Sequence, residues 1–246
     1  MNRIPVLMYH HIAPHPGDTV TVTPEVFAGQ MRLLAECGYR FLSAAELVGH
    51  VSGNSPVREK SVAITFDDGW LDNYLNAYPV LELLGIKATI FVITGRADAA
   101  SRFGCSLSVE VPVHEVAKMH IREGHAERVV LDWETIRTMA SGGLVTFHSH
   151  TVSHRRCAEL SSAELINELT ESKRSVEQEL GCSCDYLCWP YGSYSDHAVK
   201  IAREAGYRAL FTIVDGFCSS GSDPMRICRV DVRNSVESLQ LRLAAG

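Results

Sequence analysis

The chain has 246 residues, of which 46% are hydrophobic and 21% are charged, and its formal net charge is −6 at pH 7. This composition is that of a globular protein with a hydrophobic core, and the length fits one large α/β domain or two small ones. The negative charge argues against nucleic acid or an anionic membrane as the main partner. No apolar run reaches the length of a transmembrane helix, so no membrane span is expected.

The first residues do not resemble a signal peptide. Their apolar run is too short and is broken by Pro5, so the sequence as given predicts a cytoplasmic protein. The alternative is a trimmed mature form in the periplasm or outside the cell. None of the eight cysteines forms a CxxC pair, and we interpret all eight as reduced thiols that are mostly buried.

In the first third of the chain, strand and helix signals alternate. Strands are predicted at 4–10, 39–42, 61–66 and 87–93. Helices are predicted to begin after Thr23, after Ser43, where Glu46 completes a capping box, and at about Leu71. Gly38 and Gly85 end two of these helices. Strands that alternate with helices are typical of a parallel sheet or barrel.

Residues 95–131 break this alternation. They lack clear periodicity and contain three histidines, His114, His120 and His125. We interpret the segment as an insertion, partly helical, that forms a lid over a site. Solvated loop histidines are a commoner explanation for the three side chains than metal ligands.

After residue 131 the alternation resumes. Helices are predicted from Trp133, at 161–180 and at 196–205, and strands at 144–150, 184–189, 207–213 and 227–232. No internal repeat and no linker rich in Pro, Gly or Ser divides the chain. We therefore expect one domain, 1–246.

Two adjacent carboxylates, Asp67 and Asp68, follow the predicted buried strand 61–66. Successive strand side chains point to opposite sides, so the two acids can take different partners. One can bind a metal while the other acts as a base. A polar strand end that leads into a turn at Gly69 is the alternative interpretation.

A second polar cluster follows the predicted strand 144–150. His150 and His154 are four residues apart, and one helical turn there would place both imidazoles on the same side. Two histidines and a carboxylate are a common ligand set for a catalytic zinc or a similar divalent ion. Combined with an acid at a neighbouring strand end, the pattern predicts a metal site.

Three motifs, in this order and spacing, resemble those of the polysaccharide deacetylases (the NodB homology or carbohydrate esterase family 4 group). They are T-F-D-D-G at 65–69, H-T-V-S-H at 150–154 and W-P-Y-G at 189–192. The opening V-L-M-Y-H-H is similar to a branch that deacetylates poly-N-acetylglucosamine and related exopolysaccharides. The resemblance covers essentially the whole chain. It implies a single-domain, distorted (β/α) barrel of seven or eight strands, with circularly permuted motif order and its site at the strand carboxyl ends.

The resemblance also implies roles for residues. Asp68, His150 and His154 would bind one divalent ion, with zinc favoured and nickel, cobalt or iron as alternatives. Asp67 would be the general base on the metal-bound water, and the backbone N–H of Tyr191 would help to hold the oxyanion. The sugar pocket would be walled by Trp189, Pro190, Tyr191 and Gly192.

The sequence departs from the family pattern at three places. Cys188 occupies the position where the third motif often has an arginine that orients the catalytic aspartate. The exopolysaccharide branch also tends to lack this arginine. His148 stands where a small residue is expected, and its role is left open. The late Leu-x-His motif is missing, because no histidine follows His197.

The missing motif leaves the general acid to be supplied from elsewhere. In a circularly permuted barrel, His10 at the end of the first strand would reach the same rim as Asp67, so we predict that His10 is the acid. His11 points to the opposite face and is the second choice. A capped strand end without a catalytic role is the third interpretation.

The predicted function is hydrolytic removal of N-acetyl groups from an N-acetylated sugar or polysaccharide. Two alternatives stay open. One is a sugar-binding relative that has lost turnover. The other is an amidase on a small non-carbohydrate amide, since related folds are not tied to one substrate.

Overall fold

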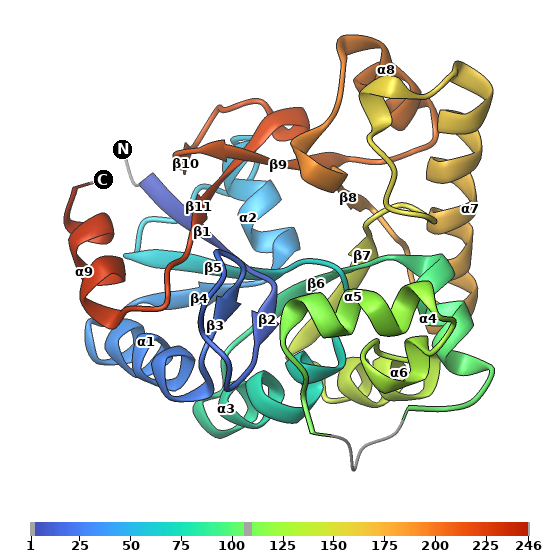
Figure 1. Ribbon diagram of the computed structural model, residues 1–246. Coiled ribbons are helices and arrows are strands. Elements are labelled where there is room, and N and C mark those ends of the chain that lie inside the picture. Colours follow the sequence, from blue (N-terminus) through green and yellow to red (C-terminus); the bar gives the residue numbers. More distant parts are fainter. Residues whose placement is uncertain (1–2, 106–109, 246) are drawn as a thin grey trace.

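The computed structural model describes residues 3–105 and 110–245. Within these residues, seven parallel strands close into a barrel, because β1 (Arg3–Tyr9) pairs with both β11 (Ile227–Asp231) and β5 (Ser61–Phe66). From β5 the barrel continues through β6 (Ala88–Val92), β7 (Val145–Ser149), β8 (Tyr186–Cys188) and β9 (Ala209–Asp215) to β11. The predicted (β/α) barrel is thereby confirmed (Figure 1).

Short strands extend the barrel at its edges. The predicted strand at 39–42 is β4 (Arg40–Leu42), which pairs parallel with residues 61–63 of β5, and β10 (Phe217–Ser219) pairs antiparallel with β1. After β1, the strands β2 (His11–Ile12) and β3 (Thr21–Val22) pair with each other. These two-residue strands and β10 are too short to give a periodic signal, and the sequence analysis missed them.

Helices surround the barrel (Figure 1). They are α1 (Pro24–Glu36), α2 (Ala44–Val51), α3 (Tyr78–Leu84), α4 (Thr94–Ser101), α5 (His114–Arg122), α6 (Trp133–Ser141), α7 (Ser162–Leu180), α8 (Asp196–Glu204) and α9 (Val236–Ala244). The predicted caps form: the Thr23 side chain accepts from the Val26 N–H, and capping boxes close at Ser43 and Ser161.

The helix expected from about Leu71 forms, because residues 71–84 are helical without a break and Gly85 ends the helix. It contains one π-helical turn, η1 (Asn73–Ala77), before α3. Pro79 lies in the first turn of α3, where its missing N–H would have no partner in any case. The helix α9 was not predicted, and it packs on α1.

Alternation along the strands separates two apolar layers. On β5, Val62, Ile64 and Phe66 belong to the large cluster between strands and helices, whereas Ala63 belongs to a second cluster. That second cluster collects side chains from the inner faces of other barrel strands, such as Phe211. Residue 67 continues the inward series of 63 and 65, so the strand period itself directs its side chain into the barrel.

The described residues of the segment 95–131, which are 95–105 and 110–131, fold against the loop that follows β5. The segment contains α4, α5 and a 3₁₀ turn, η2 (Ala126–Arg128), and it shares a small apolar cluster with Trp70. Backbone hydrogen bonds from Leu71 N–H to Val129 and from Leu131 N–H to Gly69 fix this contact. The described part of the segment is therefore held against the same loop that carries the two acids.

No helix in the described part of the chain is long and apolar enough to cross a membrane. All eight cysteines are free thiols, with Cys37 and Cys182 exposed.

Candidate metal and catalytic site

Left-handed backbone in non-glycine residues is concentrated at the carboxyl ends of the barrel strands. In the described chain, the non-glycine residues with positive φ are Asp68 (74°), Thr151 (67°), His154 (58°) and Tyr191 (57°). They follow β5, β7 and β8 in the motifs that the sequence analysis selected. Each such residue costs about 1–3 kcal/mol, and such strain gathers at functional sites. The backbone thus marks this rim independently of any family resemblance.

Asp68, His150 and His154 lie together at this rim. Asp68 Oδ1 is 3.2 Å from His154 Nε2 and 3.7 Å from His150 Nε2. One ligand atom from each side chain lies within 4.8 Å of the other two. Asp68 Oδ2 accepts a hydrogen bond from Trp70 Nε1 at 3.0 Å, while the buried Oδ1 has no hydrogen-bond partner among the described residues. The trio has the ligand types and the spacing of a divalent metal site.

The protonation states of these side chains also suit a metal. His150 Nδ1–H donates to the Cys188 carbonyl oxygen at 2.8 Å, which leaves Nε2 with its lone pair toward Asp68. Burial lowers the pKa of both histidines, that of His154 to about 3, so both are neutral at pH 7. Burial opposes the ionisation of Asp68, but the neighbouring imidazoles and Arg96 outweigh it and lower the pKa of the carboxyl.

The helical turn expected between the two histidines is absent. His150 and His154 are instead brought together by an irregular loop. Glu168, buried on α7, holds that loop: its Oε2 accepts the backbone N–H groups of Val152 and Ser153, each at 2.9 Å. A Glu on the buried face of the amphipathic helix 161–180 was the signal in the sequence that could have indicated this support.

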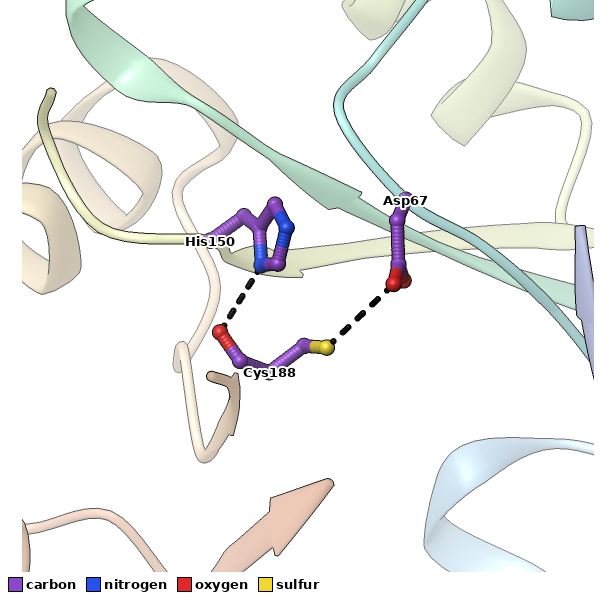
Figure 2. A group of neighbouring side chains, drawn as sticks. All are labelled: Asp67, His150 and Cys188. Atoms are coloured by element: carbon purple, nitrogen blue, oxygen red, sulfur yellow. Dashed lines mark hydrogen bonds between the residues drawn. The ribbon is translucent and has the colours of Figure 1, made fainter. Parts of the chain in front are cut away.

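Asp67 has different partners, as predicted for adjacent strand residues. Arg229 on β11 donates from Nη1 to Oδ1 and from Nη2 to Oδ2, both at 2.7 Å, and the guanidinium is 1% exposed. The Cys188 thiol lies 3.5 Å from Asp67 Oδ2 (Figure 2). It also lies 3.0 Å from Arg229 Nη2. Although burial raises the pKa of Asp67, Arg229 outweighs it and lowers the pKa to about 2. Asp67 is therefore ionised and fixed in orientation.

Arg229 is a site residue that the sequence analysis missed. The expected arginine position on β8 holds Cys188, and the guanidinium comes instead from β11, on the other side of β9 in the barrel order. The available signal was a single arginine inside the predicted strand 227–232, between apolar residues. Buried arginines are rare unless they are paired with an acid.

Asp67, His150 and Cys188 form a second group of possible metal ligands (Figure 2). Both Asp67 oxygens already accept hydrogen bonds from Arg229, and burial raises the pKa of the Cys188 thiol well above its ordinary value. A protonated thiol and a carboxylate bound to arginine are poor ligands. The Asp68 trio is the better site.

His10 and His11 diverge after β1. His10 Nε2 lies 3.8 Å from Asp67 Oδ2, and 22% of its side chain is exposed. His11 is 1% exposed, donates from Nδ1 to Asp72 at 2.5 Å, and stacks on Trp70. His10 thus reaches the rim as predicted, and His11 is a buried support for the Asp68 loop.

The acids and histidines line a cavity of about 250 Å³. Tyr191 and Ile213 are on its wall, with 53% and 51% of their surface exposed. Trp189 contributes to the lining, but it is fully buried and stacks on Tyr194. Of the predicted pocket residues, Pro190 and Gly192 are not among the lining residues.

Gly192 instead permits a close contact beneath this wall. Its φ is 61°, and a Cβ there would meet Ile213 Cγ1 at 2.3 Å. His148, whose role the sequence left open, is buried and packs against the Tyr186 ring at 4.5 Å.

A closed barrel of seven parallel strands, with its polar side chains gathered at the strand carboxyl ends, defines a NodB-like (β/α)₇ barrel. Residues 54–210 match the polysaccharide deacetylase family. The chain belongs to that family.

Individual relatives agree with this assignment. YxkH of Bacillus subtilis (strain 168) is 30% identical over 230 residues, which are 94% of this chain and 71% of that protein. The poly-β-1,6-N-acetyl-D-glucosamine N-deacetylase of Escherichia coli (strain K12) is 24% identical over 89% of this chain, which spans 35% of that enzyme. Among solved structures, the Streptococcus pyogenes deacetylase PplD in complex with acetate superposes with a TM-score of 0.79 at 26% identity, covering 97% of each chain.

Proposed function

We propose that this protein is a metal-dependent hydrolase that removes N-acetyl groups from an N-acetylated sugar or polysaccharide of the poly-N-acetylglucosamine type. The observation that carries the proposal is the separation of two adjacent acids at one rim. Asp68 lies with two neutral histidines and keeps an oxygen without a partner, while Asp67 is ionised by its contact with Arg229.

The residues at the rim fit a divalent ion. Asp68 Oδ1 is buried without a hydrogen-bond partner among the described residues. A buried carboxylate oxygen without a partner costs free energy, and a bound cation would remove this cost. Asp68, His150 and His154 would hold the ion, with zinc favoured for this donor set. When bound, the ion supplies Lewis-acid polarisation of the acetyl carbonyl and lowers the pKa of water.

Asp67 is suited to accept a proton from the attacking water. Arg229 keeps the carboxylate ionised over the whole neutral range and fixes both of its oxygens. A base that is held in one orientation loses little entropy at the moment of proton transfer. Tyr191 lines the cavity and has left-handed backbone. We propose that its backbone N–H donates a hydrogen bond to the oxyanion.

His10 is suited to protonate the departing amine. An amine is a poor leaving group unless a proton reaches its nitrogen as the C–N bond breaks. His10 lines the cavity beside Asp67 and is partly exposed, so it can exchange protons with water between turnovers.

The carbohydrate preference is supported by the cavity wall and by the relatives. Tyr191 and Ile213 present half-exposed apolar surface, against which the apolar face of a pyranose ring can pack. The E. coli relative is named for poly-β-1,6-N-acetyl-D-glucosamine. We disfavour a sugar-binding relative without turnover, because side chains that are able to act as acid, base and metal ligands occupy the positions that we propose for these roles.

The test is acetate release from N-acetylglucosamine oligomers, measured together with elemental analysis of the purified protein. We expect one divalent ion per chain and acetate release that a chelator abolishes. Full metal occupancy without release on any N-acetylated sugar would favour the binding protein. Turnover restricted to small cyclic amides would favour the amidase.

A further inference from the structure

A chain of three hydrogen-bonded side chains leads from the core to the cavity. Asp72, in the first turn of the helix after β5, accepts from His11 Nδ1 at 2.5 Å. His11 Nε2 lies 2.9 Å from Nδ1 of His114, the first residue of α5. Asp72 and His11 are buried, whereas His114 lines the cavity. The second contact joins β2 to α5, which lie side by side in Figure 1.

The carboxylate of Asp72 determines which nitrogen of His11 carries the proton. Its Oδ1 accepts from the Ile12 backbone N–H and from Asn73 Nδ2, each at 2.9 Å. With the His11 ring on Oδ2, the carboxylate accepts from three donors and has no proton of its own to give. A neutral His11 therefore carries its proton on Nδ1, and its Nε2 presents a lone pair to His114.

The same reasoning assigns the proton of His114. Because His11 Nε2 accepts, His114 Nδ1 donates, and Nε2 of a neutral ring is then left without a proton. Burial lowers the pKa of His114, and the neighbouring His11 and Lys118 lower it further. The carboxylates of Asp18 and Asp68 oppose this shift but do not reverse it, so the ring is neutral at pH 7. Among the described residues, the side chain of His114 makes its one hydrogen bond to His11, and Nε2 is an acceptor without a donor.

The ring that carries this acceptor is held in place. His11 stacks on Trp70 with the ring centres 4.1 Å apart, and the His114 ring stands edge-on to both, at 73° to His11 and at 78° to Trp70. Trp70 is fixed in turn by its hydrogen bond to Asp68. A ring that is already ordered by packing and by one of its nitrogens loses little freedom when the other nitrogen binds a ligand.

A neutral acceptor in the cavity wall recognises a hydrogen-bond donor. An N-acetylated sugar offers two kinds of donor, its amide N–H and its hydroxyl groups. The amide belongs to the group that we place beside Asp67 and His10, so a hydroxyl is the donor that remains for the wall formed by α5.

We infer that His114 is a specificity-determining residue whose Nε2 accepts a hydrogen bond from a free hydroxyl, on C3 or C6, of the N-acetylated sugar. His11 and Asp72 are positioning residues that keep this nitrogen unprotonated. The inference rests on the proposed deacetylase function and adds to it a requirement for one free hydroxyl on the substrate.

The experiment compares di-N-acetylchitobiose with two analogues, one without the hydroxyl at C3 of both rings and one without the hydroxyl at C6 of both rings. The two analogues separate the possible sources of the donor. We expect kcat/KM of the wild type to be about 10-fold lower on one analogue than on the parent sugar, the effect of one lost hydrogen bond, and nearly unchanged on the other.

His114→Ala should lower kcat/KM on the parent sugar by about 10-fold and change it by less than about 2-fold on the sensitive analogue, because the same hydrogen bond is already missing there. His114→Gln offers an amide oxygen as acceptor and should recover part of the loss. His120→Ala changes a histidine of the same helix that does not line the cavity, and as the matched control it should alter none of the three rates.

The proton positions give a readout that does not depend on activity. NMR of the ring nitrogens should show His114 Nε2 without a proton in the wild type. Asp72→Asn keeps an oxygen for the Ile12 N–H and so turns an amide NH₂ toward His11. His11 Nδ1 then accepts, the order of protons along the chain reverses, and His114 Nε2 acquires a proton. This variant should stay folded and lose the discrimination between the parent sugar and the sensitive analogue.

A protonated His114 Nε2 in the wild type would overturn the inference. Equal losses in His114→Ala on the parent sugar and on both analogues would also overturn it, because the role of His114 would then be structural. An absence of acetate release from all three sugars in the wild type would reject the proposed function instead. Calorimetric titration with the same sugars then decides the inference alone. Weaker binding of one analogue, with the difference lost in His114→Ala, supports it, and equal binding or no binding of the three overturns it.

Discussion

The two acids of the D-D-G turn, Asp67 on what we call its inner side and Asp68 on its outer side, differ in how many hydrogen bonds their carboxylate oxygens accept. On the inner side, both oxygens of Asp67 accept hydrogen bonds from Arg229. On the outer side, Asp68 has left-handed backbone, one oxygen without a partner among the described residues, and two neutral imidazoles nearby. We propose that the fully paired carboxylate is held for proton transfer and that the one without a partner is left for a cation. In this proposal, neighbouring residues of the same type acquire different roles from their surroundings.

The largest expected effect is on the outer side. His154→Ala removes one ligand of the trio, so the protein should lose its divalent ion and all measurable deacetylation. Elemental analysis and acetate release on the same sample check this. Full metal occupancy in the variant would refute the ligand assignment. His120→Ala, a histidine of α5 that does not line the cavity, is the matched control and should retain both metal and activity.

The second effect is on the inner side. Asp67→Asn keeps the shape of the side chain but cannot accept the proton, so turnover should fall by about 10²–10⁴-fold. Single-turnover acetate release measures the loss. Because Asn cannot carry the charge that Arg229 neutralises, the melting temperature should be recorded as well. If the melting temperature shows that the variant is inactive because it is unfolded, the result would contradict the assigned role.

His10→Ala sharpens the comparison by testing the acid beside Asp67. Its turnover of amide substrates should fall by about 10²-fold. Hydrolysis of a nitrophenyl acetate, whose leaving group needs little protonation, should fall much less. His11→Ala acts on the buried contact with Asp72 and should affect stability instead. Equal losses on amide and ester would remove His10 from the acid role.

Arg229→Lys gives the smallest effect at neutral pH, about 10-fold in kcat/KM, because the charge stays while the two-point contact is lost. The pH profile is more informative. Asp67 must be ionised, and its pKa is about 2 in the wild type, so its protonation limits activity only near that pH. A weaker contact lets burial raise the pKa, and the acid limb should move to higher pH. An unchanged acid limb would show that Arg229 does not control Asp67.

The sequence was sufficient for the barrel and for the residues within contiguous motifs. Alternating strand and helix signals predict a parallel sheet or barrel because each signal is local, and the family resemblance selected the barrel. Asp67, Asp68, His150 and His154 lie at or shortly after the ends of predicted strands. Arg229 could not be placed this way, because its contact with Asp67 joins residues 162 positions apart. That contact exists only when β11 closes the barrel near β5.

The path of the backbone within the motifs was also beyond local patterns. Four-residue spacing predicts a helical turn between His150 and His154, but Thr151 and His154 take left-handed backbone. Glu168 on α7 stabilises that loop by accepting its N–H groups. Tertiary hydrogen bonds overrode the local preference, and one sequence alone does not reveal such bonds.

The most direct test of the division between the two acids is the metal content of Asp67→Asn and Asp68→Asn, prepared in parallel and measured by elemental analysis. Both substitutions remove one negative charge from adjacent residues and preserve side-chain shape, so they control for each other. The account predicts about one divalent ion per chain in Asp67→Asn and little or none in Asp68→Asn. Metal retained in Asp68→Asn and lost from Asp67→Asn would contradict it and would reverse the two roles.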